Sequence, residues 1–211
     1  MNKFLIKLVD RHPELKQNEA SIEQAFGMIC RSLENNGTLF ICGNGGSAAD
    51  AEHITGELLK GFMKKRPLSA AVKQQYSKQF GREGLDIASK LQGGVKAVAL
   101  TSHPAFGTAF LNDVDGSLIY GQQLNALGSP GDVLLGISCS GNAENVRKAM
   151  MVARMKGIKT ILLTGCGNGS CVEVSDCVIG VPCRETFMIQ EYHLPIYHAL
   201  CMMIEDHFYD E

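Results

Sequence analysis

The sequence predicts an α/β fold, a doubly wound three-layer αβα sandwich with a central parallel sheet of about five strands. Two observations predict this fold. Short apolar runs rich in β-branched residues alternate with longer segments of helical period, as in a parallel sheet covered by helices on both faces. Each apolar run is only five or six residues long and mostly apolar, as expected for strands that are buried on both faces.

The elements follow one another in regular order along the chain. The expected strands are 38–42, 96–101, 133–138, 160–164 and 177–181. The expected helices are about 21–35, 48–62, 117–127, 143–156 and 185–208. Glycines support these boundaries, because Gly37 and Gly157 follow predicted helices and Gly131 precedes the third predicted strand.

The length of 211 residues favours a single domain, residues 1–211, with N-terminal helices at about 1–36. An inserted segment at about 64–94 is polar, carries several glycines and separates the first two strands by more than one crossover needs. We expect it to hold one extra helix, near 71–80 or 85–91. Its role is either that of a lid or that of an ordinary surface excursion.

Composition and charge exclude several classes of protein. The 20 basic and 22 acidic residues give a net charge of -2. The chain therefore lacks the excess of positive charge with which nucleic-acid-binding proteins neutralise phosphates. No run approaches the ~20 apolar residues of a membrane span, and the N-terminus does not read as a signal peptide. We therefore expect a cytoplasmic protein with no nucleic-acid or membrane partner, whose eight cysteines are reduced thiols.

A glycine-rich turn follows the first predicted strand, in the segment CGNGGS at 42–47. Its glycines let the backbone turn tightly, and Ser47 begins a helix whose free N–H groups and dipole favour an anion. Such a turn alone also suits a dinucleotide or no ligand. The spacing matches neither GxGxxG nor a nucleotide-binding P-loop, so we expect no nucleotide cofactor.

A second polar loop follows the third predicted strand. Ser138 and Ser140 flank Cys139, and Gly141-Asn142 opens the next helix. Either loop alone has a purely structural explanation as a helix cap. Two such loops on adjacent strands of an open α/β sheet would face one ligand, because ligands bind at the carboxyl ends of the strands.

Candidate acid–base groups lie on two predicted helices. His53 and Glu57 share a helix face beside the glycine-rich turn, and Gln190 and His198 are eight residues apart on the last helix. Spacing alone leaves His193 open as an alternative to His198. A carboxylate and an imidazole suit the interconversion of an aldose and a ketose, which needs a base at carbon and a proton shuttle between two oxygens. The same set also suits a divalent metal that stabilises an enediolate. That set is His53, Glu57, Gln190 and His198.

Four segments resemble the signature segments of sugar isomerase (SIS) domains, and specifically of their phosphoheptose isomerase branch. They occur in the family's order and span nearly the whole chain. These segments are CGNGGSAADAEHITGEL at 42–58, LNDVDG at 111–116, GDVLLGISCSGNAENV at 131–146 and IQEYHLPIYHAL at 189–200.

The resemblance implies an isomerase that converts sedoheptulose 7-phosphate to D-glycero-D-manno-heptose 7-phosphate for lipopolysaccharide or related heptose synthesis. It implies Glu57 as the base and His198 as the acid. The implied substrate-binding residues are Asn44, Gly45, Gly46, Ser47, Asn112, Asp113, Ser138, Cys139, Ser140 and Gln190. In members that carry zinc, the implied ligands are His53, Glu57, Gln190 and His198. Family members are usually homotetramers with sites at subunit interfaces.

Three features depart from the family pattern. Cys139 stands where the family commonly has Thr, and Ala143 stands where it often has Ser. The segment 64–94 is longer than the corresponding segment of family members. Two other functions stay open at this stage: a non-catalytic phosphosugar-binding or regulatory SIS module, and an isomerase of another phosphosugar. Regulatory members resemble the loops but lack the Glu and His, both of which this sequence keeps.

Overall fold

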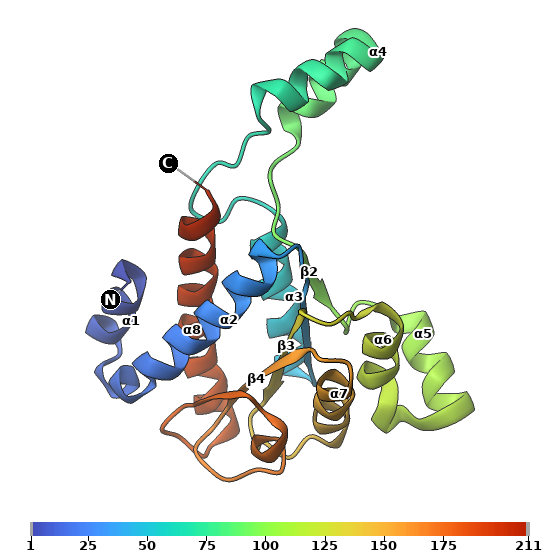
Figure 1. Ribbon diagram of the computed structural model, residues 1–211. Helices are drawn as coiled ribbons and strands as arrows, with labels where there is room; N and C mark the ends of the chain where they lie inside the picture. Colours follow the sequence, from blue (N-terminus) through green and yellow to red (C-terminus); the bar gives the residue numbers. More distant parts are fainter. Residues whose placement is uncertain (1, 210–211) are drawn as a thin grey trace.

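A single sheet of five parallel strands lies at the centre of the molecule, and the computed structural model describes residues 2–209 (Figure 1). The strands are β1 (Leu39–Gly43), β2 (Ala97–Ala99), β3 (Val133–Ser138), β4 (Lys159–Thr164) and β5 (Cys177–Gly180). They lie in the order β2-β1-β3-β4-β5. The predicted three-layer α/β sandwich is confirmed.

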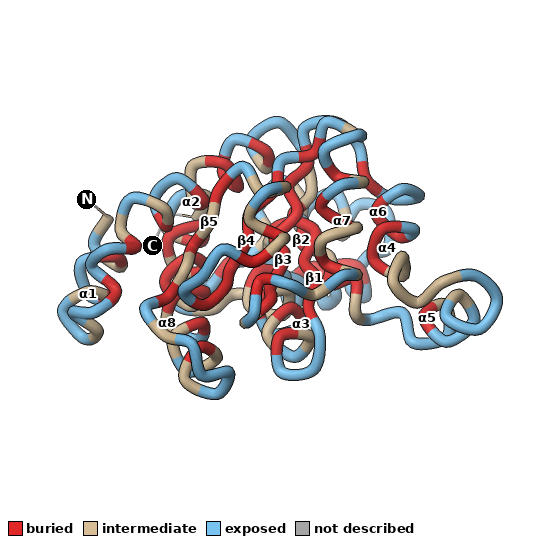
Figure 2. The backbone as a smooth tube through the Cα atoms, turned by 90° about the horizontal axis from the view of Figure 1, so that it is seen from below, coloured by how far each residue is buried: buried red, intermediate tan, exposed pale blue. Residues whose placement is uncertain are grey.

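Helices cover both faces of the sheet. They are α1 (Lys3–Arg11), α2 (Glu19–Glu34), α3 (Gly46–Leu59), α4 (Ala70–Lys90), α5 (Pro104–Phe110), α6 (Ile119–Leu127), α7 (Glu144–Met155) and α8 (Thr186–Phe208). One core joins the sheet to α1, α2, α3 and α8, and the other joins it to α6 and α7. Figure 2 shows the buried residues concentrated in the strands and the exposed ones in the outer turns of α1 and α5.

The strands serve both cores because their side chains alternate between the two faces. In β3, Leu135 and Ile137 face the first core and Leu134 faces the second. Gly136 lets α7 approach closely, since a Cβ there would lie 2.7 Å from the Met150 side chain. In the register of the sheet Gly43 pairs with Ile137, so the carboxyl ends of β1 and β3 lie together.

Most element boundaries fall within two or three residues of the predicted ones, and two differences stand out. The strand expected at 96–101 is reduced to Ala97–Ala99, because β2 is an edge strand that pairs only with β1. The expectation of one extra helix in the insert was wrong. Both 71–80 and 85–91 are largely helical and form one bent element, α4, that turns at Gly81 with a φ of +60°.

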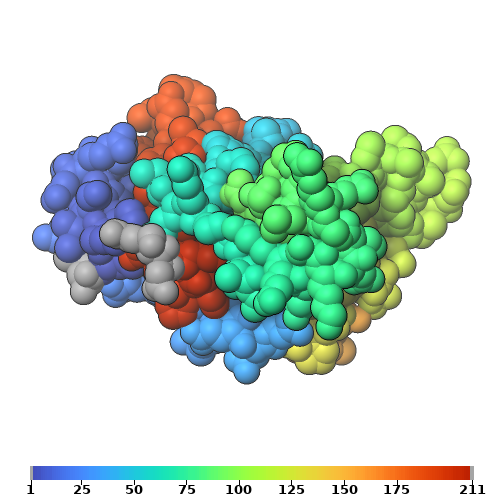
Figure 3. Space-filling model, turned by 90° about the horizontal axis from the view of Figure 1, so that it is seen from above, coloured from blue at the N-terminus to red at the C-terminus, as the bar shows by residue number. Residues whose placement is uncertain are grey.

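The insert forms an arm that projects from the body, drawn in teal and green in Figures 1 and 3. Within α4 only Gly84 and Ala88 are buried. Gly84 lets the two halves of the arm touch, because a Cβ there would lie 2.2 Å from the backbone oxygen of Tyr76. Two extended segments, paired at Pro67 and Gln92, connect the arm to the body. None of the helices within residues 2–209 has an apolar stretch that would reach across a lipid bilayer.

Candidate active site

The glycine-rich turn joins β1 to α3 at the carboxyl end of the sheet. Gly45 has a φ of +57°, a conformation that glycine adopts without strain. Gly43 is needed for close packing, since a Cβ there would lie 2.6 Å from the backbone oxygen of Ser47. The Ser47 N–H donates to the Asn44 carbonyl at 3.0 Å, which closes the turn. The N-terminus of α3 therefore points its amides and dipole at the space beside this turn.

The serine-containing loop between β3 and α7 lies next to it. Gly141 has a φ of +67°, and the Asn142 N–H donates to the Ser140 hydroxyl at 3.2 Å. The two loops meet where the Ser47 Oγ lies 3.8 Å from the Cys139 Sγ. The structure thus brings both predicted anion-binding loops together on the neighbouring strands β1 and β3.

A reciprocal amide pair links the first loop to α7. The Asn44 side chain donates to the Asn145 carbonyl oxygen at 2.8 Å, and the Asn145 side chain donates back to Asn44 at 2.9 Å. The Tyr120 hydroxyl donates to the Gly43 carbonyl and so braces the same turn from α6. Sequence reasoning missed Asn145 and Tyr120. The only available signal for Asn145 was its position in the first turn of the helix after the second loop.

Three predicted substrate-binding residues lie at different distances from these loops. The Gln190 amide lies against the first loop, because a Cβ on Gly46 would meet its Nε2 at 2.5 Å. Asn112 and Asp113 occupy the exposed π-helical turn Leu111–Asp115, where the Asn112 amide donates to the Asp113 carboxylate at 2.8 Å. Within residues 2–209 no hydrogen bond joins this turn to either loop.

The predicted base Glu57 lies near the end of α3 with a nitrogen partner at each carboxylate oxygen. Its Oε1 is 3.3 Å from the His53 Nε2, and its Oε2 is 3.1 Å from the Lys60 Nζ. The Glu57 side chain is only 15% exposed. Both contacts run along one helix face, as the spacing of four and three residues predicts.

The predicted acid His198 lies beside this pair on α8. Its ring centroid is 5.1 Å from that of His53, and its Nε2 is buried without a hydrogen-bond partner within residues 2–209. Burial and the neighbouring His53 lower the pKa of His198, and Glu57 acts in the opposite direction. His193, the alternative that spacing left open, is fully buried in α8. The structure therefore leaves His198 as the histidine of α8 that lies near Glu57.

A cavity of about 630 Å³ lies between α1 and α8, and His198 is one of its lining residues. Apolar side chains such as Phe4, Leu194 and Met202 form much of its wall. The charged residues in its lining balance, since Lys7 and Arg11 are accompanied by Asp10 and Glu191. His198 thus lies near Glu57 and also lines this partly apolar cavity.

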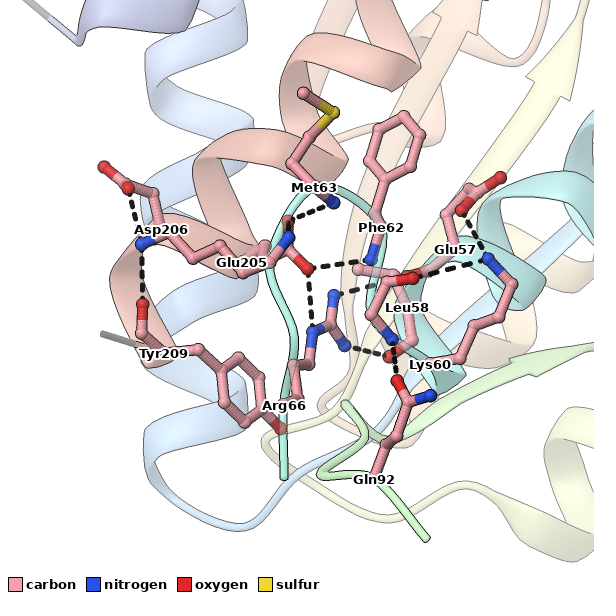
Figure 4. Close-up of polar contacts among 12 residues, drawn as sticks. Glu57, Leu58, Lys60, Phe62, Met63, Arg66, Gln92, Glu205, Asp206 and Tyr209 are labelled. Atoms are coloured by element: carbon pink, nitrogen blue, oxygen red, sulfur yellow. Dashed lines mark hydrogen bonds and ion pairs between the residues drawn. The ribbon is translucent and has the colours of Figure 1, made fainter. Parts of the chain in front are cut away.

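A buried ion pair ties the far end of α3 to α8 (Figure 4). The Arg66 Nε lies 2.9 Å from the Glu205 Oε1, and the two side chains are 0% and 1% exposed. Glu205 also accepts the backbone N–H groups of residues 62–64. Arg66 donates to the carbonyl oxygens of Leu58 and Glu57. The pair therefore holds the turn after Glu57 against the helix that carries His198.

Hydrogen bonding keeps this buried carboxylate ionised. Burial alone raises the pKa of Glu205, but the N–H groups of Phe62 and Met63 and the guanidinium of Arg66 together hold that pKa below its usual range. The aromatic ring of Tyr209 adds a cation–π contact, 4.7 Å from the Arg66 guanidinium. The network leaves both charges fully partnered, which a buried ion pair needs to be stable.

The donor chemistry around Glu57 suits a divalent metal in part. Zinc prefers imidazole nitrogen and carboxylate oxygen, and the unpartnered Nε2 of His198 is such a donor. His53 has only Nε2 free, because its Nδ1 is 3.0 Å from the Tyr197 hydroxyl. Gln190 lies at the other end of α3, beside Gly46. Within residues 2–209 no three His, Cys, Asp or Glu side chains are gathered closely enough to hold an ion as they stand.

Comparison with known proteins places the chain in a family. The SIS domain family matches residues 4–98 and 87–165. The phosphoheptose isomerase of Rhodospirillum rubrum is 39% identical over 186 residues, which cover 88% of this chain and 85% of that protein.

Two solved structures share the architecture. The phosphoheptose isomerase from Neisseria gonorrhoeae superposes with a TM-score of 0.74 at 31% identity, over 96% of this chain and 93% of that one. A phosphoheptose isomerase from Francisella tularensis gives a TM-score of 0.73 at 29% identity, over 98% of this chain and 100% of that one.

Proposed function

The chain belongs to the phosphoheptose isomerase branch of the SIS domain family, and from this premise we propose that it interconverts sedoheptulose 7-phosphate and D-glycero-D-manno-heptose 7-phosphate. One observation carries the proposal most strongly. The carboxylate of Glu57 on α3 and the imidazole of His198 on α8 both lie beside His53, and the N-terminus of the same helix α3 is the proposed phosphate cradle. Non-catalytic binding needs the cradle alone, so the acid–base pair favours an enzyme.

Each group has a place in the reaction. The amides at the beginning of α3 and the hydroxyls of Ser138 and Ser140 bind the phosphate. Glu57 takes the proton from the carbon beside the carbonyl and returns it to the neighbouring carbon. His198, kept largely neutral by its lowered pKa, both donates and accepts a proton at the two oxygens.

The spacing along α3 supports a long sugar phosphate. Gly46 and Glu57 are eleven residues apart, which separates their backbones by ~16 Å along the helix axis. The side chain of Glu57 leans back toward the beginning of the helix and shortens this gap. A heptose chain with C–C bonds of about 1.5 Å, extended by its phosphate, suits the gap better than a triose phosphate does.

Zinc is part of the proposal as a bound cofactor, with His53, Glu57 and His198 as the side chains that would hold it. Gln190, the fourth ligand that the resemblance implies, lies beside Gly46 at the other end of α3 and does not fit the same ion within one subunit. When bound, zinc would act as a Lewis acid that stabilises the enediolate oxygen. The unpartnered Nε2 of His198 supports this assignment. Metal analysis of the purified protein tests it, and full activity after exhaustive chelation would reject it.

We also propose a homotetramer that works in the cytoplasm, with sites at subunit interfaces. The cavity beside His198 supports only the contact between copies of the chain. Its apolar wall between α1 and α8 is a surface that a second copy of the chain would cover. Light scattering on the purified protein measures the number of subunits. A fully active monomer would reject the proposed homotetramer.

The test of function is a direct assay against sedoheptulose 7-phosphate and a panel of other ketose and aldose phosphates. We expect the heptose pair to give the highest kcat/KM. If another phosphosugar is preferred, the departures from the family pattern are the candidates for the altered substrate preference. These are the arm at 64–94, Cys139 and Ala143. Binding of the panel without turnover of any member would make the chain a phosphosugar-binding module instead.

A further inference from the structure

A pair of side-chain amides joins the beginnings of two helices at the candidate site. Asn44 lies in the turn just before α3, and Asn145 is the second residue of α7. The loops that precede these helices follow β1 and β3, whose carboxyl ends lie together. The Asn44 Nδ2 is 2.8 Å from the Asn145 Oδ1, and the Asn145 Nδ2 is 2.9 Å from the Asn44 Oδ1. The pair therefore lies beside helix N-termini that favour an anion.

A backbone N–H fixes which way round the two amides lie. The Val146 N–H is one of the N-terminal groups of α7 that find no partner within a helix, and it lies 3.0 Å from the Asn145 side chain. An N–H only donates, so the Asn145 atom that it meets must be the oxygen. The nitrogen of Asn145 then faces Asn44, where it can bond only to the amide oxygen. The reciprocal pair thus has a single orientation.

This orientation decides what Asn44 can offer to a ligand. Its oxygen accepts the Asn145 N–H and lies 3.3 Å from the Tyr120 hydroxyl, so two protein groups already contact it. Its nitrogen carries two hydrogens and uses one of them in the pair. The second hydrogen has no acceptor in the part of the chain that the structure describes, and Asn44 is exposed. Asn44 therefore presents an N–H donor, which suits an anion, and holds back the oxygen, which would repel one.

We propose that Asn145 is a positioning residue for substrate binding, which holds Asn44 so that its free N–H binds the phosphate group of the sugar phosphate. Asn145 keeps this amide from rotating by 180° and placing its oxygen against the phosphate. The sugar phosphate as ligand rests on the proposed function, whereas the binding of inorganic phosphate tests the role of Asn145 without any turnover.

Asn145→Ala removes the partner of Asn44. We expect KM to rise about 10-fold with kcat within a factor of two, because a hydrogen bond to the phosphate is made in the ground state and the transition state alike. Asn125→Ala is the matched control, since Asn125 is exposed on α6 and its side chain makes no hydrogen bond within residues 2–209. KM should stay unchanged in this control.

Asn145→Ser separates this effect from any loss at the beginning of α7. The serine hydroxyl can still accept the Val146 N–H, while the amide pair is lost. The melting temperature should therefore stay close to that of the unmodified chain, and KM should rise as in Asn145→Ala.

A double-variant cycle shows whether Asn145 acts through Asn44. We expect Asn44→Ala alone to raise KM about 10-fold as well, and the combination of Asn44→Ala with Asn145→Ala to raise it no further. An independent, structural role of Asn145 would instead make the two losses multiply.

Isothermal titration calorimetry with inorganic phosphate gives a readout that needs no turnover. We expect the Kd of phosphate to rise about 10-fold in Asn145→Ala and in Asn145→Ser, and to stay unchanged in Asn125→Ala. If the unmodified protein turns over no phosphosugar but shows this pattern, the proposed function fails and the role of Asn145 stands.

Two results would overturn the proposal. One is an unchanged Kd of phosphate in both Asn145→Ala and Asn145→Ser. The other is a pair of KM losses that multiply in the double variant.

Discussion

The 23-residue helix α8 and the 21-residue bent element α4, whose two helical halves join at Gly81, are held in place in opposite ways. α8 buries ten residues along its length, and it packs against α1, α2 and α3. α4 buries only two, Gly84 and Ala88, and stands clear of the body (Figure 1). The two elements therefore differ in how much tertiary packing holds them.

The difference also appears in their charged groups. Glu205 on α8 is buried in a fully partnered network with Arg66, whereas the Asp86–Lys90 pair on α4 is exposed to solvent. A buried charge is costly to leave alone, and an exposed one is not. Substitutions along the seam between α3 and α8 should thus have large effects, and substitutions on the arm small ones.

Glu57→Gln should give the largest effect. It keeps the shape of the side chain and removes the base, so we expect kcat to fall by about 10²- to 10⁴-fold with little change in melting temperature. Glu52→Gln is the control, because Glu52 lies one turn away on the same helix and is exposed. Comparable turnover in the two variants would remove Glu57 from the chemistry.

Arg66→Met should give the largest loss of stability. It leaves the Glu205 carboxylate buried without its cation, which costs about 3–5 kcal/mol of unfolding free energy. Denaturant titration measures this loss. Glu205→Gln should cost a similar amount, because it leaves the buried Arg66 guanidinium without its anion and gives only one oxygen to N–H groups that now use both oxygens of Glu205. Equal stability of Arg66→Met and the unmodified chain would show that the seam is not held by this pair.

The sequence predicted the central strands well because they are buried on both faces, as β3 at Val133–Ser138 shows. It could not predict the short β2, because the length of an edge strand depends on its single neighbour. The bend at Gly81 was missed for a similar reason. Both halves of α4 are helical, and they pack closely at Gly84, a contact that no local pattern signals.

In the candidate site, too, local sequence patterns predicted some features and tertiary contacts decided the others. Local patterns predicted the two loops, since glycine and serine after a buried strand have a direct backbone explanation. Spacing could not choose between His193 and His198, because both lie on one long apolar helix and only packing buries His193. The contact between Asp50 and Tyr197 joins positions 147 residues apart, which no local pattern signals.

The burial of His193 should make the free energy of unfolding depend on pH, an effect of intermediate size. Burial lowers the pKa of His193 to about 4 from an ordinary value of 6.5, although the Thr164 backbone acts in the opposite direction. Between pH 6.5 and 4 the unfolded chain binds a proton that the folded chain does not, so stability falls as the pH falls. The contribution is at most about 1.4 kcal/mol per pH unit.

His193→Leu removes that proton from the unfolded chain. Its unfolding free energy should therefore fall less steeply below pH 6.5 than that of the unmodified protein. The exposed His103 provides the control, since His103→Leu should leave the slope as it is. Parallel slopes for His193→Leu and the unmodified chain would mean that His193 is accessible to protons in the folded state.

Asp86→Ala should give the smallest effect. It removes the ion pair with Lys90 on α4, whose side chains are 60% and 72% exposed, so the unfolding free energy should change by less than about 0.5 kcal/mol. Removing Asp86 also favours the helix slightly, because alanine has the higher helix propensity. A loss above about 1 kcal/mol would mean that the arm is packed in solution, since an exposed pair cannot supply it. Denaturant titration at two protein concentrations separates the cases, because packing against a second copy makes the loss depend on concentration.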